Sequence, residues 1–227
     1  MVEGNDINPV ERFLRLRQLI PDHVRITAVS KFKPVSMIAD LFSQTGHKLF
    51  GENKAQELTS KYRELPSGIE WHFIGHLQTN KVKLIAPFVS LIQSVDSFKL
   101  LAEINKEALN FNRIIPVLLQ FHIATEETKF GFSMDEALKM LNEAVFDNCK
   151  NVSICGVMGM ATFTDDTKLI TNEFRKLYYN FTELKNRFFA QKEDFCEISM
   201  GMSDDYRIAI AEGSTMVRIG SGIFGNR

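Results

Sequence analysis

Cysteine is scarce in this sequence, and a long apolar run is missing from its N-terminal stretch. The three cysteines, Cys149, Cys155 and Cys196, are odd in number and lack the paired spacing of metal ligands. Such cysteines are typical of free thiols in a reducing compartment. The N-terminal stretch reads MVEGNDINPVERFLRLRQL, and its charges interrupt any apolar segment, which argues against a signal peptide or a membrane span. We therefore expect a cytoplasmic protein.

An excess of charge of one sign is absent as well. Lysine and arginine number 27 against 28 aspartates and glutamates, for a formal net charge of −1. This balance leaves no electrostatic footprint for nucleic acid or for an anionic membrane, so we expect neither as a partner and favour a small-molecule ligand. With 44 % hydrophobic and 24 % charged residues, the chain of 227 residues has the composition of one globular domain, residues 1–227.

Short apolar stretches alternate with helical patterns along the whole chain. A leading helix from Val10 to Ile20 ends at Pro21, and each strand-like stretch after it is followed by a helical pattern. The predicted strands span residues 25–31, 48–52, 70–75, 90–96, 115–123, 153–161, 196–200 and 216–219. The N-cap residues predicted for four of the helices are Asn53, Ser97, Ser133 and Ser203.

This alternation predicts an α/β fold, a single (β/α)8 TIM barrel with an extra N-terminal helix. A doubly wound open sheet is the alternative. A dinucleotide-binding sheet of that kind carries a glycine-rich turn after its first strand, whereas this sequence has Ser30-Lys-Phe-Lys-Pro34 there. The barrel is therefore favoured, and its functional site is expected at the C-terminal ends of the strands.

Polar residues and glycines gather at these predicted strand ends. Lys31 ends the first strand, and strand alternation places it on the same face as Thr27 and Val29. Arg218 shares a face of the last strand with Gly220. Barrel closure makes the first and last strands neighbours, so lysine and arginine can meet in one cavity, where two buried cations need an anion. The other strand-end residues are Glu52, Asn53, His76, Asp96, Met158–Met160, Ser199–Ser203 and Gly220–Gly222.

The chemistry of these residues narrows the class of ligand. A desolvated lysine is the amine that forms Schiff bases, and TIM barrels often bind phosphate through the loops after strands seven and eight. Lys31 beside a phosphate describes a class I aldolase or a pyridoxal 5'-phosphate (PLP) protein. Arg218 favours PLP because an arginine can hydrogen-bond a pyridine nitrogen. The alternatives are that Lys31 only decorates a loop and that Arg218 lies exposed on an edge strand.

A metal site is not predicted. His72 and His76 are spaced like a pair of metal ligands, but residues four apart share a face only on a helix, and this segment is predicted as strand and turn. Cys155 and Cys196 have no assigned base, so a thiolate nucleophile is not predicted either.

Several motifs, in order, resemble one known family. They are Ala28-Val-Ser-Lys-Phe-Lys-Pro34, Phe50-Gly-Glu-Asn53, Trp71-His-Phe-Ile-Gly-His-Leu-Gln78 with Asn80-Lys81, Ser199-Met-Gly-Met-Ser-Asp-Asp205 and Gly213-Ser-Thr-Met-Val-Arg-Ile-Gly220. From about residue 10 to the C-terminus, the chain resembles the pyridoxal phosphate homeostasis proteins, the YggS/PROSC family. The departures from the family pattern are Phe32, where Thr or Ser is usual, and Gly159 in the sixth strand, where Thr is common.

The resemblance implies a barrel of the alanine racemase N-terminal type, with PLP held as an internal aldimine on Lys31. It implies that Arg218 lies at the pyridine nitrogen and that Asn53 lies near the cofactor. The implied phosphate-binding positions are Ser199, Gly201, Gly220 and Ser221. Met158, at the end of the sixth strand, is predicted among the cofactor-binding residues.

Alanine racemases use a second acid/base, a tyrosine from a C-terminal β domain, and this sequence ends soon after Gly220. We therefore expect a non-catalytic, monomeric carrier or buffer of PLP that acts in intracellular PLP homeostasis, with apo PLP-dependent enzymes as candidate partners. The alternative is a single-domain amino-acid racemase with Lys31 as one base and Tyr206, His76 or water as the other. A sugar-phosphate aldolase is a third possibility.

Overall fold

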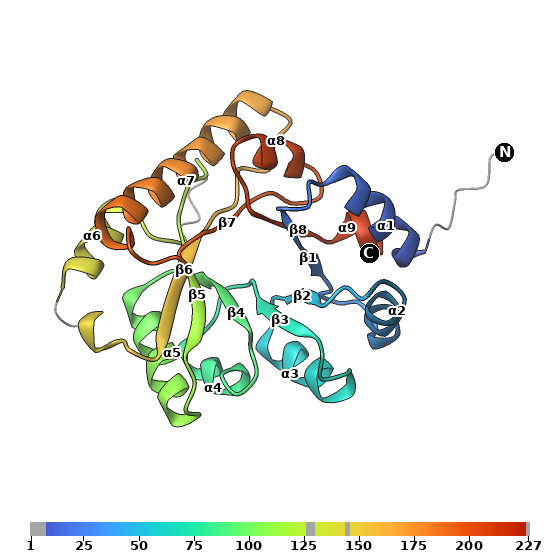
Figure 1. The fold of residues 1–227 in the computed structure, drawn as a ribbon, viewed down its shortest axis with the longest axis horizontal. Helices are drawn as coiled ribbons and strands as arrows, with labels where there is room; N and C mark the ends of the chain where they lie inside the picture. The colour runs from blue at the N-terminus through green and yellow to red at the C-terminus, as the bar shows by residue number, and fades with distance from the viewer. Residues whose placement is uncertain (1–7, 126–129, 144–145, 226–227) are drawn as a thin grey trace.

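The structure is a computed structural model that describes residues 8–125, 130–143 and 146–225. Within these residues, eight parallel strands close into a barrel in the order β1 to β8, and helices surround it (Figure 1). The predicted (β/α)8 barrel is confirmed, and the open-sheet alternative is wrong. The elements in chain order are α1 (Pro9–Leu19), β1 (Arg25–Val29), α2 (Val35–Thr45), β2 (Leu49–Glu52), α3 (Ala55–Glu64), β3 (Glu70–Phe73), η1 (Thr79–Lys81), α4 (Val82–Ile85), β4 (Leu91–Val95), α5 (Phe98–Asn110), β5 (Ile115–Gln120), α6 (Met134–Asn142), η2 (Phe146–Asn148), β6 (Val152–Met158), α7 (Thr167–Phe188), β7 (Glu197–Ser199), α8 (Tyr206–Ala211), β8 (Met216–Ile219) and α9 (Ser221–Phe224).

The first and last strands join to close the barrel. They pair in parallel, with Thr27 opposite Arg218 and Ala28 opposite Ile219. Lys31 follows β1 and Gly220 follows β8, so the loops that carry them leave the same end of neighbouring strands. The predicted neighbourhood of the first and last strands is therefore present, and it allows Lys31 and Arg218 to reach one cavity.

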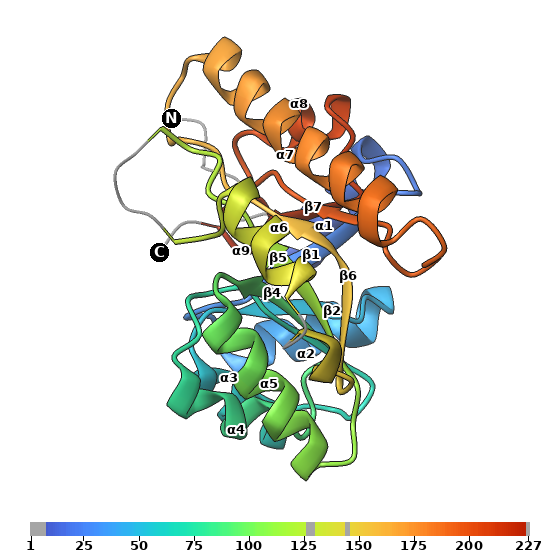
Figure 2. The same cartoon turned by 90° about the vertical axis from the view of Figure 1, so that its left-hand side faces the viewer.

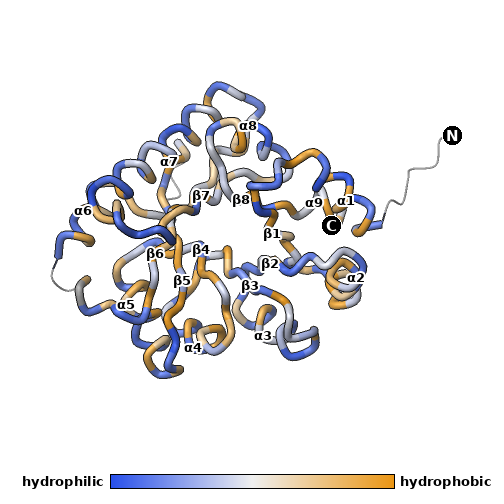
Figure 3. Tube along the Cα trace, in the orientation of Figure 1, coloured by the Kyte–Doolittle hydropathy of each residue, from blue (hydrophilic) through white to orange (hydrophobic). Residues whose placement is uncertain are grey.

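Apolar side chains fill the layer between the strands and the surrounding helices. Figure 3 shows hydrophobic colour along the strands and hydrophilic colour over much of the outer helices. A smaller cluster of Leu91, Leu118, Met158 and Met216 is separate from this layer and is fully or almost fully buried. Each helix buries one apolar stripe against the barrel, as a helix on a two-layer fold must.

The extra N-terminal helix is present and closes the ring of helices. Helix α1 packs against α2 and α9, so both ends of the described chain lie on one side of the barrel (Figure 1). The long helix α7 runs along the outside next to α8 (Figure 2). Helix α9 is a single turn that begins directly after Gly220 and was not predicted from the sequence. No helix among the described residues is long and apolar enough to cross a membrane.

Two of the four predicted N-caps are confirmed. The Ser97 hydroxyl accepts a hydrogen bond from the N–H of Leu100, and Ser133 forms a reciprocal capping box with Glu136. The predictions for Asn53 and Ser203 are wrong. The N-cap residues are Lys54 and Asp205 instead, because the side chains of Asn53 and Ser203 face the cavity described below.

Candidate cofactor site

A cavity of about 570 Å³ opens at the C-terminal ends of the barrel strands. This volume is within the range of small-molecule and cofactor sites. Five of the eight predicted cofactor-binding residues line the cavity: Lys31, Asn53, Arg218, Gly220 and Ser221. Its mouth is apolar and open, since the lining side chains Phe163 and Met160 are 86 % and 41 % exposed. The structure therefore brings residues of all five sequence motifs into one pocket.

Lys31 extends the inward face of the first strand into the cavity. Thr27 lies in the barrel interior, where its hydroxyl accepts a hydrogen bond from Gln93, and Val29 and Lys31 line the cavity above it. The alternation predicted from the sequence is thus observed. The Lys31 ammonium forms no hydrogen bond or ion pair with any residue that the structure describes. Its amine is available to a ligand.

Arg218 is a buried cation on the cavity wall. Strand β8 pairs with both β1 and β7, so the edge-strand alternative is wrong, and Arg218 is only 4 % exposed. Its guanidinium donates to the Ser199 hydroxyl over 2.7 Å and to the Gly159 carbonyl over 2.9 Å. Burial lowers the pKa of Arg218 to about 10, and the negative charge of Asp205 raises this pKa by a smaller amount. The side chain therefore stays protonated near neutral pH.

Behind Arg218, a line of polar side chains crosses the barrel interior. The Ser199 hydroxyl donates to Gln93 Oε1 over 2.6 Å, and Gln93 Nε2 donates to His72 Nδ1 over 2.9 Å. All three side chains are 3 % exposed or less. A buried polar group that keeps its partners holds one orientation, so this line fixes the direction of the Arg218 guanidinium. Sequence reasoning missed Gln93, although a glutamine within a strand that is buried along its whole length is an unusual signal.

A hydroxyl oxygen already lies against the backbone N–H groups after β8. Ser203 Oγ accepts hydrogen bonds from the N–H groups of Gly220 and Gly222, over 3.3 and 3.2 Å. These two N–H groups therefore converge on one position, where an oxygen atom can accept a hydrogen bond from both. Ser203 lines the cavity together with Gly220, and sequence reasoning assigned it to a helix cap rather than to the site.

Asn53 carries an unsatisfied polar atom at the cavity. Its Oδ1 is buried and has no hydrogen-bond partner among the described residues. Buried polar atoms without a partner are uncommon, so this oxygen fits a ligand that donates to it or approaches it through water. Gly75 permits the arrangement, because an added Cβ there would lie 2.4 Å from the Asn53 carbonyl oxygen.

Three predicted residues do not line the cavity. Met158 lies in the barrel interior, two residues before Met160, which does line it. The Ser199 hydroxyl is bound to Arg218 and Gln93. Gly201 has a φ of +94°, and its carbonyl accepts a hydrogen bond from the backbone N–H of Arg218 over 2.9 Å. Ser199 and Gly201 thus contact Arg218 rather than the open space.

Gly159 does not enlarge the cavity. An added Cβ would meet Ile123 Cδ1 at 2.8 Å and Leu177 Cδ2 at 3.0 Å. This direction points to the packed layer between the barrel and α7, which carries Leu177. The departure from the family pattern at this position is therefore a packing difference.

His76 lines the cavity and has a carboxylate partner. Its Nδ1 lies 2.9 Å from Asp96 Oδ2, and its ring centroid lies 4.4 Å from that of Phe130. His72 is turned into the barrel instead, so the two histidines do not converge, and the described residues contain no cluster suited to a metal ion. Tyr206 is 7 % exposed and lies outside the lining of the cavity.

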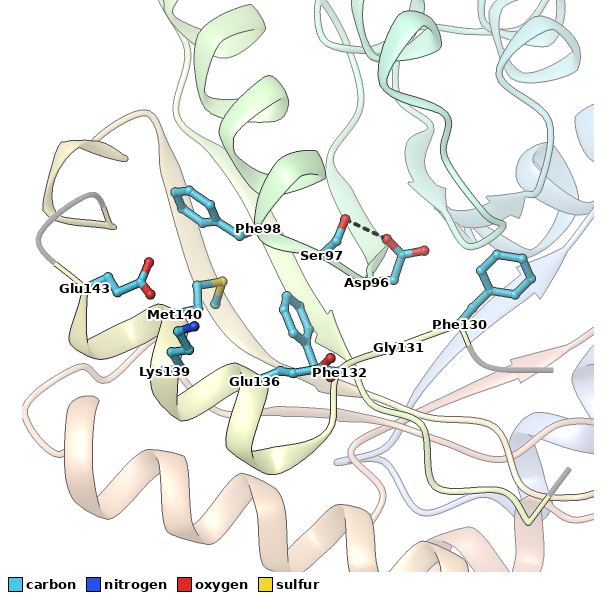
Figure 4. A pocket seen from close by; sticks show the side chains of 10 residues that line it. All are labelled: Asp96, Ser97, Phe98, Phe130, Gly131, Phe132, Glu136, Lys139, Met140 and Glu143. Atoms are coloured by element: carbon cyan, nitrogen blue, oxygen red, sulfur yellow. Dashed lines mark hydrogen bonds between the residues drawn. The ribbon is translucent and has the colours of Figure 1, made fainter. Parts of the chain in front are cut away.

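A neighbouring cavity of about 510 Å³ shares Phe130 with the first. Its lining side chains come largely from helix α6 and from the segments just before α5 and α6 (Figure 4). It gathers Glu136, Lys139 and Glu143 but none of the predicted cofactor-binding residues. The larger cavity is therefore the candidate cofactor site.

Comparison with known proteins agrees with this geometry. Residues 10–227 match the family model described as the alanine racemase N-terminal domain. The chain is 38 % identical over 207 residues to a pyridoxal phosphate homeostasis protein of Haemophilus influenzae, covering 90 % of this chain and 85 % of that protein. It is 36 % identical over 222 residues to the human protein of the same name, covering 94 % and 80 %.

Solved structures give the same result. PipY of Synechococcus elongatus, determined with PLP bound, superposes with a TM-score of 0.86 at 30 % identity, covering 96 % of this chain and all of PipY. Alanine racemase of Clostridium difficile superposes with a TM-score of 0.77 at 14 % identity, covering 97 % of this chain and 57 % of that chain, which shows the fold alone. The chain therefore belongs to the alanine racemase N-terminal domain family and, within it, to the pyridoxal phosphate homeostasis proteins that its sequence motifs resemble.

Proposed function

We propose that this protein binds PLP in the larger cavity and acts as a carrier or buffer in intracellular PLP homeostasis. The observation that carries the proposal is the convergence of an unpartnered Lys31 amine and a buried Arg218 guanidinium in one open cavity. The names of its relatives and the PLP found in PipY support the same function.

The residues fit the chemical parts of PLP. The cofactor supplies an aldehyde that condenses with a primary amine, together with a pyridine ring and a phosphate. Lys31 would hold the aldehyde carbon through Nζ, and Arg218 would face the pyridine nitrogen. Gly220 and Ser221 would hold the phosphate, whose oxygens can take the position that Ser203 Oγ now fills.

The remaining predicted residues would act from one layer further away. Ser199 and Gly201 would hold Arg218, and Met158 would form part of the floor beneath the cofactor. Asn53 would offer its buried Oδ1 to the ligand.

We propose that the protein does not turn over amino acids. Racemisation requires a proton donor and a proton acceptor on opposite faces of the substrate carbon. Lys31 offers one amine. The experiment is incubation of the PLP-loaded protein with L- and D-alanine in deuterated water, followed by NMR. We expect no catalytic exchange of the α-proton, and rapid exchange would overturn the non-catalytic function.

The racemase alternative has one observation in its favour. His76 lines the cavity and is oriented by Asp96, as a general base often is. If the exchange is observed and the His76→Gln variant loses it, His76 is the second base. Tyr206 is the weaker candidate because it lies outside the cavity lining.

We further propose that residues 1–227 form one cytoplasmic, monomeric domain that delivers PLP to apo PLP-dependent enzymes. The three free thiols support a reducing compartment, and the exposed mouth of the cavity supports exchange of the ligand. Sedimentation would show the monomer. Activation of an apo PLP-dependent enzyme by the loaded protein, faster than by an equal concentration of free PLP, would show direct delivery.

A further inference from the structure

The two peptide groups that flank Lys31 are each held by a side chain of helix α3. Lys61 Nζ donates to the Ser30 carbonyl over 2.8 Å, and this carbonyl belongs to the peptide bond before Lys31. Glu57 Oε1 accepts the Phe32 N–H over 2.7 Å, and this N–H belongs to the peptide bond after Lys31. The backbone of Lys31 is thus fixed by a hydrogen bond on each side.

Lys61 and Glu57 form an ion pair with each other, and Lys61 also pairs with the buried carboxylate of Glu52. Lys61 Nζ lies 2.7 Å from Glu57 Oε1 and 2.8 Å from Glu52 Oε1. Glu52 Oε1 also accepts the Ser30 hydroxyl over 2.6 Å. Lys61 is 5 % exposed and Glu52 is fully buried, so the Lys61–Glu52 pair is shielded from solvent and holds a fixed geometry, while Glu57 lies at its partly exposed edge.

The residue after Lys31 has an unusual backbone conformation. Phe32 has a φ of +62°, a region that residues other than glycine seldom adopt. The bond from its N–H to Glu57 and the position of Lys54 Nζ, 4.9 Å from the centroid of its ring, hold it there. Such conformations persist where the surroundings impose them, and they cluster at functional sites.

We propose that Glu57 and Lys61 are positioning residues that set the direction of the Lys31 side chain for its bond to the ligand. This inference rests on the proposed function. Neither residue lines the cavity, so their effect on PLP is indirect, and the proposed route is their bonds to the peptide groups on either side of Lys31. Glu57 carries the test because it is partly exposed, whereas removal of Lys61 would leave Glu52 buried without its cation.

The first measurement compares PLP binding by the wild type, Glu57→Ala and Glu57→Gln in equilibrium dialysis. We expect Glu57→Ala to bind PLP about tenfold more weakly, the size of one lost hydrogen bond to a charged group. Glu57→Gln should recover part of the loss, because its amide oxygen can still accept the Phe32 N–H. The matched control is Glu64→Ala on the same helix. Among the described residues, the Glu64 carboxylate accepts a hydrogen bond only from the exposed Ser60 hydroxyl, so PLP binding should stay unchanged.

The second measurement repeats Glu57→Ala in a Lys31→Ala background, where any remaining PLP is bound without the amine. A positioning role predicts no further loss there. An equal loss in both backgrounds, or wild-type binding by Glu57→Ala, would overturn the positioning role. Equal PLP binding by the wild type and Lys31→Ala would instead overturn the proposed function, so the two failures are distinguishable.

Discussion

The hydroxyl of Ser199 lies between the Arg218 guanidinium and the Gln93 amide. It accepts a hydrogen bond from Arg218 over 2.7 Å and donates one to Gln93 over 2.6 Å. Ser199 therefore connects the cation on the cavity wall to the polar line that ends at His72 in the barrel interior. A hydroxyl suits this position because it donates and accepts at the same time.

Ser199→Ala should weaken PLP binding without touching the cavity wall. The change leaves Arg218 Nη1 and Gln93 Oε1 buried without this partner, which costs about 1 to 3 kcal/mol of unfolding free energy and loosens the guanidinium. Equilibrium dialysis should show about tenfold weaker binding. The control is Ser214→Ala, since within the described part of the chain the buried Ser214 hydroxyl hydrogen-bonds to backbone carbonyls alone. Equal PLP binding by the two variants would contradict the role given to Ser199.

Arg218→Lys should fail to replace the arginine although it keeps the charge. An ammonium cannot reproduce the two diverging bonds to Ser199 and to the Gly159 carbonyl. We expect about tenfold weaker PLP binding in dialysis. Arg25→Lys, on the neighbouring strand with an ion pair to Glu197, serves as the control. Wild-type affinity in Arg218→Lys would show that a charge alone is enough.

Stability should fall as the pH is lowered, in part through His72. Burial, and to a smaller extent the charge of Arg25, lower the pKa of His72 from 6.5 to about 3. Between these values the unfolded chain binds a proton that the folded chain does not, so the unfolding free energy falls with falling pH, by about 1.4 kcal/mol per pH unit from this group. Above pH 6.5 the group contributes no dependence.

The test separates His72 from other titrating groups, including Glu52, whose pKa burial raises and whose contribution has the opposite sign. His72→Gln keeps an acceptor for the Gln93 amide and removes the titration. Urea unfolding near pH 7 and near pH 5 should therefore show a shallower pH dependence in the variant. Identical dependence in both proteins would mean that His72 is accessible to protons in the folded state.

Gly159→Ala should destabilise the fold and leave PLP binding intact. The added methyl group would press on Ile123 Cδ1, and overpacking of this kind costs about 1 to 3 kcal/mol. Ile123→Val removes that δ-carbon, so the double variant should be more stable than the sum of the single changes predicts. Strict additivity in urea unfolding would contradict the contact. A change in PLP affinity would show that the strain at Gly159 reaches Arg218, which donates to the Gly159 carbonyl.

Strand periodicity was enough to predict where Lys31 and Arg218 point. A side chain on every second residue faces the barrel, and closure makes the first and last strands neighbours, so two local patterns combine into one cavity. Strand periodicity does not predict how close a residue lies to the cavity end of its strand. Met158 is the last residue of β6 and is fully buried, whereas Met160, two residues beyond the strand, lines the cavity. The end of a strand depends on its pairing with the neighbouring strands, which its own sequence does not show.

The two wrong helix caps have a common physical origin. Asn53 and Ser203 have the side chains that favour an N-cap, and this preference is local. In the folded chain both side chains face the cavity, so the helices begin later, after Lys54 and Asp205. The hydrogen bonds beside Lys31 could not be predicted from the sequence for a similar reason. Lys61 looks like an ordinary surface lysine in the sequence, and its bond to the Ser30 carbonyl forms only when β1 and α3 pack together.

The most direct test of the central claim is to identify the lysine that bonds to PLP. The wild type is mixed with PLP, reduced with borohydride to fix any carbon–nitrogen double bond, and digested for mass spectrometry. We expect a single labelled peptide that contains Lys31, together with a cofactor absorption band before reduction that Lys31→Ala lacks. A label on another lysine, or an unchanged band in Lys31→Ala, would contradict it.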